Sequence, residues 1–134
     1  MKPALLIAFL LVCSNVFAEK NEQFEKQYWD NSHALKKALS KIVDNILEQK
    51  PNLEPNKKNY KAELESEYIR CMADKEAIRF YRHIVDQFSA YQAMLESDNV
   101  VPASKEEMIR NLSDSITSIE KRKKILKDTE YNCS

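Results

Sequence analysis

Apolar side chains recur at steps of three, four or seven along residues 57–98, a stretch that contains no Gly or Pro. This spacing places them on one stripe of an α-helix, with polar residues on the other faces. We therefore predict one long helix over residues 57–98, about 60 Å long at about 1.5 Å per residue. The stripe consists of Tyr60, Leu64, Tyr68, Cys71, Ile78, Tyr81, Val85, Phe88 and Leu95.

A second amphipathic stretch, residues 21–49, has the same periodicity and predicts a helix that packs against the long one. Asp30, Asn31 and Ser32 interrupt it, because these residue types favour helix caps over helix interiors. The helix can therefore restart at Ser32, which would leave residues 24–29 as a separate arm. The apolar positions of this stretch are Phe24, Tyr28, Leu35, Leu39, Ile42 and Ile46.

Turn signals separate these helices from each other and from a third one. Asn56 is a suitable N-cap for the long helix. Asn99 can adopt the left-handed conformation at its end, and Val101 is biased towards an extended conformation because it precedes Pro102. Ser104 then opens a Ser-x-x-Glu capping box, which predicts the start of the third helix. The apolar face of that helix carries Met108, Leu112, Ile116, Ile119 and Leu126.

The composition supports an all-α fold. The 134 residues include no Gly, four Pro and 31% charged residues. Without Gly the chain lacks the phosphate-binding loop, the dinucleotide fingerprint and the Gly-based hairpin turns. We predict an antiparallel three-helix bundle with a long central helix. The alternative is a bundle of four helices, with a break near Ala73 and Asp74.

The first 18 residues have the pattern of a secretory signal peptide. Lys2 provides the positive start, residues 4–12 are apolar, and Val16 and Ala18 fit the positions before a cleavage site. The apolar run is shorter than the about 20 residues that a membrane-spanning helix needs. We therefore expect cleavage after Ala18, export to the periplasm or the medium, and a single domain over residues 19–134. Lipidation at Cys13 is a minor alternative.

The helical turns also predict which residues face each other. If the third helix folds back near residue 100, residue n of the long helix faces about residue 200 minus n. Cys71 then lies opposite residue 129, within reach of Cys133 at the end of the chain. In an oxidising compartment this geometry predicts an intramolecular disulfide between Cys71 and Cys133. An intermolecular bridge and two free buried thiols are the alternatives.

The same geometry identifies a candidate interface with a partner. Folding about residue 53 places the first helix over residues 57–86, and the third helix covers residues 71–95. The last turns of the long helix are then covered on one side only, so their apolar residues can bind a partner or simply pack in the core. The candidate interface residues are Phe88, Tyr91, Met94 and Leu95, with Phe24, Tyr28 and Trp29 on the first helix.

Few residues indicate chemistry. His33 and His83, the only histidines, should lie about 15 Å apart in this register. We therefore expect no metal site, no cofactor and no enzymatic activity, because hydrolase motifs are also missing. The 21 basic and 21 acidic residues balance, so neither nucleic acid nor a membrane surface is an expected partner. These observations favour an exported interaction protein, an adaptor, inhibitor or chaperone-like module, that binds another protein or forms a homodimer. The alternative is a carrier of a small apolar ligand or lipid between the helices.

Overall fold

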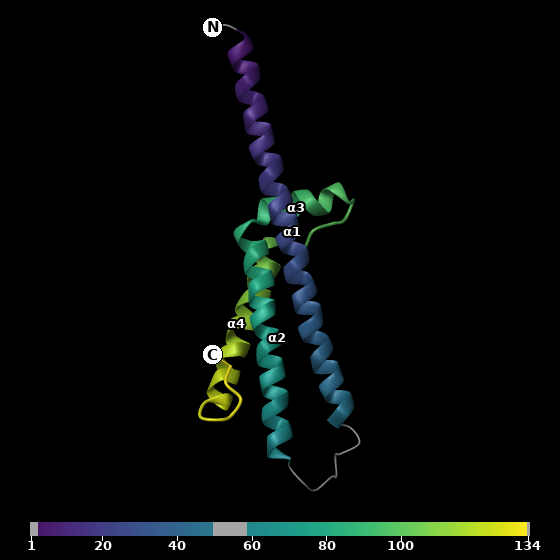
Figure 1. The fold of residues 1–134 in the computed structure, drawn as a ribbon, viewed down its shortest axis with the longest axis vertical. Helices are drawn as coiled ribbons and strands as arrows, with labels where there is room; N and C mark the ends of the chain where they lie inside the picture. The colour runs from purple at the N-terminus through teal and green to yellow at the C-terminus, as the bar shows by residue number, and fades with distance from the viewer. Residues whose placement is uncertain (1–2, 50–58, 134) are drawn as a thin grey trace.

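A computed structural model of the chain describes residues 3–49 and 59–133, and every regular element in these ranges is an α-helix (Figure 1). The prediction of an all-α protein is therefore confirmed. The four helices of the described ranges are α1 (Pro3–Gln49), α2 (Tyr60–Asp86), α3 (Phe88–Ser97) and α4 (Lys105–Leu126).

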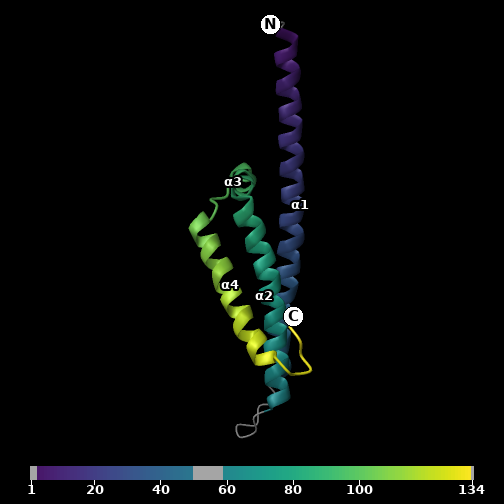
Figure 2. The same cartoon turned by 90° about the vertical axis from the view of Figure 1, so that its left-hand side faces the viewer.

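The three long helices form an antiparallel bundle with α2 in the middle. Figures 1 and 2 both show α1 on one side of α2 and α4 on the other, and each packs along α2. The short helix α3 turns away from the end of α2 and crosses α1. The bundle is thus a layer of three helices, closed at one end by α3.

The long central helix differs from the prediction at Gln87. Its backbone (φ −127°, ψ 44°) leaves the helical region and separates α2 from α3. The alternative break near Ala73 and Asp74 is wrong, because α2 continues through both residues. We attribute the break at Gln87 to side-chain packing, since Tyr91 on α3 lies against Tyr28 on α1, with ring centroids 6.1 Å apart. A straight continuation of α2 would carry the Tyr91 ring away from Tyr28.

Helix α1 is continuous through Asn31, so the restart at Ser32 and the separate arm over residues 24–29 are wrong. The side chain of Asn31 is only 6% exposed. Its neighbours one turn away on either side, Tyr28 and Leu35, are also partly covered. The packing of this face therefore outweighs the weak helix propensity of residues 30–32.

The predicted helix ends are largely confirmed. The hydroxyl oxygen of Ser104 accepts a hydrogen bond from the backbone N–H of Glu107 at 3.1 Å, as expected for an N-cap. Asn99 adopts the left-handed conformation with φ 56°. The N-cap of α2 is Asn59, whose side chain accepts a hydrogen bond from a backbone N–H of the first turn. We predicted this role for Asn56, which lies outside the described residues.

The buried side chains form two groups along the bundle. The aromatic cluster lies at the α3 end and is centred on Phe24, Ile84, Tyr91 and Met108, which come from all four helices. The disulfide cluster lies towards the other end, between α2, α4 and the C-terminal tail. Its buried members are Leu64, Cys71, Ile119, Leu126 and Cys133.

The first turns of α1 project beyond the other helices (Figures 1 and 2). Among residues 21–49 of α1, whose side chains the structure describes, Phe24 is the first that contributes to either buried cluster. Within residues 3–49 and 59–133, no helix carries an apolar stretch long enough to cross a membrane.

Candidate functional site

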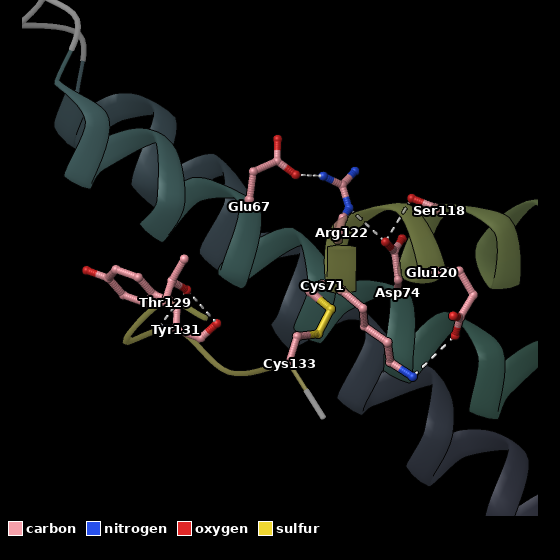
Figure 3. The surroundings of a disulfide bond; sticks show 10 residues. Glu67, Cys71, Asp74, Ser118, Glu120, Arg122, Thr129, Tyr131 and Cys133 are labelled. Carbon is pink, nitrogen blue, oxygen red and sulfur yellow. Dashed lines mark hydrogen bonds and ion pairs between the residues drawn. A yellow bond between two sulfur atoms is a disulfide. The ribbon is translucent and has the colours of Figure 1, made fainter. Parts of the chain in front are cut away.

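The predicted disulfide between Cys71 and Cys133 is confirmed. The two Cα atoms lie 6.3 Å apart, and the bond joins the middle of α2 to the C-terminal tail (Figure 3). Cys71 is fully buried and Cys133 is 2% exposed, so the bond is part of the core. A disulfide shielded in this way is structural, because attacking thiolates cannot reach either sulfur.

The tail reaches α2 because it reverses direction after α4. Asp128 takes the left-handed conformation with φ 65°. The hydroxyl of Thr129 donates a hydrogen bond to the backbone carbonyl of Leu126 at 2.8 Å. The ring of Tyr131 then packs against Tyr68 on α2, with centroids 5.8 Å apart. These contacts hold the tail alongside α2, where the disulfide forms.

A polar network fixes the register between α2 and α4. Arg122 on α4 lies between Glu67 and Asp74 on α2 and donates to Asp74 at 2.9 Å (Figure 3). Ser118 donates to the same carboxylate at 2.8 Å. The side chains of Arg122 and Asp74 are each 19% exposed, so water screens this ion pair only weakly.

The register itself differs from the prediction by one to two helical turns. We expected Asp74 to face about residue 126, but it faces Ser118 and Arg122. Likewise Tyr81, predicted opposite Ile119, belongs to the aromatic cluster, whereas Ile119 packs in the disulfide cluster. The reason is that α3 turns aside, so the fold-back joins the end of α2 to the start of α4 and is centred before residue 100.

The predicted interface residues meet in the aromatic cluster. Phe24 is 2% exposed and Tyr91 6% exposed, so both serve to pack the core. Trp29 is 47% exposed, and its ring contacts the ring of Tyr28 edge-on. We expected the first helix to cover only residues 57–86 of the long helix, and the contact between α1 and α3 was therefore missed. The remaining predicted residues are partly buried around the cluster: Tyr28, Phe88, Met94 and Leu95.

Two polar side chains within this cluster have defined environments. The ring of His83 stacks on Phe24 with centroids 4.5 Å apart, and its Nε2 lies 3.1 Å from the backbone carbonyl oxygen of Phe24. Because a carbonyl only accepts, Nε2 carries the proton and donates it. Burial raises the pKa of the Tyr28 hydroxyl, and the nearby Tyr91 adds to this effect.

The histidines do not form a metal centre with other residues. His33 lies on the exposed side of α1 beside Trp29, whereas His83 is buried in the aromatic cluster. Among the side chains that the structure describes, no group of three or more His, Cys, Asp or Glu is arranged to hold a metal ion.

A shallow groove of about 340 Å³ runs between α1 and α2. The small side chains of Ala34 and Ala38 form one wall, and Ile69 and Met72 form part of the other. The groove is open to solvent. A site that holds an apolar ligand would instead enclose most of the ligand surface.

Among residues 21–49 of α1, the exposed large apolar side chains other than Trp29 gather near the end of the helix, on a surface that periodicity alone did not single out. Leu39, Val43, Ile46 and Leu47 are 49%, 55%, 42% and 56% exposed, and we call them the α1 patch. Five of the nine residues 39–47 are large and apolar, and at about 3.6 residues per turn they form a stripe about 140° wide. Helix α2 covers one side only, and α4 lies beyond α2 (Figure 1). An apolar stripe of this width normally packs against another element.

Comparison of the chain with protein-family models, with curated proteins and with solved structures finds no match. The function proposed below therefore rests on the surfaces, the disulfide and the sequence features of this chain.

Proposed function

We propose that this chain is an exported, non-enzymatic interaction protein that binds a protein partner through the α1 patch. The observation that carries the proposal is the exposure of four large apolar side chains on a helix whose other side is already packed on α2. Contiguous exposed apolar residues of this kind are typical of protein-binding surfaces. An adaptor, inhibitor or chaperone-like module would use such a surface.

The α1 patch differs from the interface that we expected from the sequence. Phe24 and Tyr91 are too deeply buried to contact a partner while the chain is folded. Trp29, also predicted, lies 18 residues before Leu47 on α1, which is five helical turns at about 3.6 residues per turn. The exposed Trp29 ring is therefore on the same side of α1 as Leu47 but about 27 Å from it along the helix at about 1.5 Å per residue, with Lys36 and Ser40 between them.

Export is supported by two features. The disulfide between Cys71 and Cys133 is of the kind that forms and persists in oxidising compartments. Residues 1–18 have the sequence of a signal peptide, and cleavage after Ala18 would remove only the part of α1 that projects beyond the bundle (Figure 2). The intact mass of the purified protein tests this: we expect a chain that begins at Glu19. A lipid attached at Cys13 or an uncleaved chain would contradict it.

The carrier alternative has less support. A carrier needs an enclosed apolar cavity, whereas the groove between α1 and α2 is open and is lined in part by the charged Lys37, Lys41 and Glu76. A partner protein can cover an open surface of this kind, because its own side chains replace the water.

The proposal is tested by capture of partners with the mature chain, residues 19–134, as bait in extracts of its own cell envelope and medium. The patch variant combines Val43→Glu and Leu47→Glu. The matched control combines Ile109→Glu and Ile116→Glu, which lie on α4 and are 46% and 39% exposed. Circular dichroism checks that both variants fold.

We expect the wild-type bait and the α4 control to retain the same partner, because the two substitutions of the control lie outside the patch. The patch variant should lose it, because each glutamate places a charge in the interface. Equal capture by all three baits would show that the α1 patch is not the binding surface. The absence of both capture and self-association would contradict the proposed function as a whole.

A further inference from the structure

The second half of α1 packs on α2 without joining a hydrophobic core. We call residues 33–49 the distal segment of α1. Phe24 and Tyr28, earlier on α1, belong to the aromatic cluster, but no residue of the distal segment contributes to either buried cluster. The segment instead meets α2 along a seam of positions at steps of three and four. The seam positions, all at least partly buried, are Leu35, Ala38, Ile42, Asn45 and Gln49.

Polar side chains occupy the most buried positions of this seam. Asn45, 7% exposed, is the most buried residue of the distal segment. Asn31 precedes it by two heptads on the same face and is 6% exposed, and its Nδ2 has no hydrogen-bond partner. A buried polar group without a partner lowers stability, and a polar residue in a helix seam weakens the pairing. The free energy that holds the distal segment on α2 is therefore small.

The pairing of α2 with α4 depends on other contacts. The disulfide between Cys71 and Cys133 ties the chain after α4 to the middle of α2. Arg122 on α4 donates a hydrogen bond to Asp74 on α2, and the disulfide cluster fills the space between these elements. None of these contacts involves the distal segment, so they persist when the segment leaves α2.

Residues 30–32 mark the point where the distal segment can separate from the rest of α1. Before this point, Phe24 is held by ring stacking and by the Nε2–H of His83. Asp30, Asn31 and Ser32 have weak helix propensity and are preferred N-cap residues. A break among them costs little helix stability, and their side chains can cap the new end of the distal segment.

We propose that the distal segment is hinged at residues 30–32 and detaches from α2 as one unit, while residues 24–29 and the pairing of α2 with α4 stay in place. Opening breaks the hydrogen bond from Gln49 to the backbone carbonyl oxygen of Ala62, which measures 3.1 Å. It uncovers the face of α2 on which the segment lies, including Ile69. The inference goes beyond the proposed function and does not depend on it, because it concerns contacts within the chain only.

Native-state hydrogen exchange of the purified, disulfide-bonded protein tests this opening. An isolated helix of this length is marginal in water, so the amides of the distal segment lose their protection when it detaches. We expect these amides to share one opening free energy. They should be about 100-fold less protected than amides in the middle of α2 and α4, with a weaker dependence on urea.

The position of the hinge is read from the same exchange data. Amides of residues 26–29 should keep the protection of the aromatic cluster, and the loss of protection should begin within or just after residues 30–32. A loss that begins before residue 26 would show that all of α1 detaches, which overturns the hinge. Equal protection and equal urea dependence in α1, α2 and α4 would overturn the proposal as a whole.

Two isoleucine variants distinguish a separate segment from a single cooperative bundle. Ile119→Val weakens the disulfide cluster, which is the same whether the distal segment is docked or detached. It should lower the protection of α2 and α4 about fivefold and leave that of the distal segment unchanged. Ile42→Ala, in the seam, should lower the protection of the distal segment about tenfold. If Ile119→Val lowers the protection of all three helices equally, the bundle opens as one unit and the proposal fails.

A matched pair of leucine variants tests the polar seam as the cause. Asn45→Leu should slow the opening about tenfold, because an apolar side chain replaces a polar one against α2. Asp44→Leu is the control, since it introduces the same side chain at the neighbouring exposed position, and it should slow the opening about twofold at most through helix propensity. Equal slowing by both variants would overturn the seam as the weak point of the docked segment.

Discussion

His83 on α2 is held against Phe24 on α1 by two contacts at once. Its ring stacks on the Phe24 ring with centroids 4.5 Å apart, and its Nε2–H donates to the Phe24 backbone carbonyl at 3.1 Å. The acceptor is a backbone carbonyl of α1, so the contact ties a side chain of α2 to the α1 backbone. This pair fixes the middle of α1 on α2, while the α1 patch further along the helix remains exposed.

Replacement of Phe24 by alanine should destabilise the bundle strongly. Phe24 is among the most buried side chains of the described part, and its loss would leave a cavity between α1, α2 and α3. We expect Phe24→Ala to lower the free energy of unfolding by about 3–5 kcal/mol in urea denaturation. The control Glu25→Ala, on an exposed neighbour, should have little effect. Equal stabilities would show that the aromatic cluster does not hold α1 to α2.

Loss of the disulfide should also lower stability. The bond joins residues 62 positions apart, and the chain-entropy model gives about 4 kcal/mol for a loop of this length. We expect Cys133→Ser to lower the melting temperature markedly under non-reducing conditions. Wild-type protein that is reduced in denaturant and refolded with reductant should melt at a similarly lowered temperature, and the same treatment should not change the variant further. An unchanged melting temperature in both cases would contradict a stabilising role.

The disulfide shows which parts of the fold could be predicted from the sequence and which could not. Its partners were predicted from a fold-back centred near residue 100, and that register proved wrong by one to two turns. The pairing survived because the tail after Leu126 reverses and carries Cys133 back along α2. A flexible tail of several residues tolerates an error in register that a contact between two rigid helices, such as Tyr81 with Ile119, does not.

The polar network around Arg122 should stabilise the bundle through the interaction of its side chains with one another rather than through any single hydrogen bond. Arg122 and Asp74 are both mostly buried, and Ser118 shares the same carboxylate. We expect Arg122→Met and Asp74→Asn each to cost about 1–3 kcal/mol in urea denaturation, because each leaves polar partners unsatisfied. The double variant should cost less than the sum of the two. Strict additivity would show that the two side chains do not interact energetically.

The break at Gln87 could not be predicted from local sequence. The surrounding residues have no Gly or Pro, and the apolar stripe continues through Val85, Phe88 and Leu95. The residue that Tyr91 of α3 packs against, Tyr28, belongs to α1, which lies far away in the sequence. The exposure of the α1 patch could not be predicted from local sequence either. Periodicity predicts an apolar stripe without showing which part of it another helix covers.

The turn between α3 and α4 allows a matched test of backbone strain. Asn99 has φ 56°, a conformation that costs a residue with a Cβ atom more than it costs glycine. We therefore expect Asn99→Ala to lower the free energy of unfolding by about 1 kcal/mol. Asn99→Gly should leave it nearly unchanged or raise it slightly. Both values come from urea denaturation, and equal losses in the two variants would indicate that the asparagine side chain, not the backbone, is what matters.

Tyr28 should make the stability of the bundle sensitive to alkaline pH. Burial raises the pKa of its hydroxyl above the ordinary value of about 10, and the neighbouring Tyr91 raises it further. The unfolded chain therefore loses this proton at a lower pH than the folded chain. The resulting contribution to stability is fully present below pH 10 and is lost as the pH rises through the pKa of the folded state.

We expect the free energy of unfolding of the wild type, measured in urea between about pH 8 and pH 11, to fall at the alkaline end of the range. In Tyr28→Phe the fall should be smaller, because phenylalanine cannot ionise. Tyr60→Phe is the matched control, since Tyr60 is 67% exposed and contributes to neither buried cluster. Its profile should follow that of the wild type. If Tyr28→Phe loses stability as steeply as the wild type, ionisation of another group causes the alkaline loss.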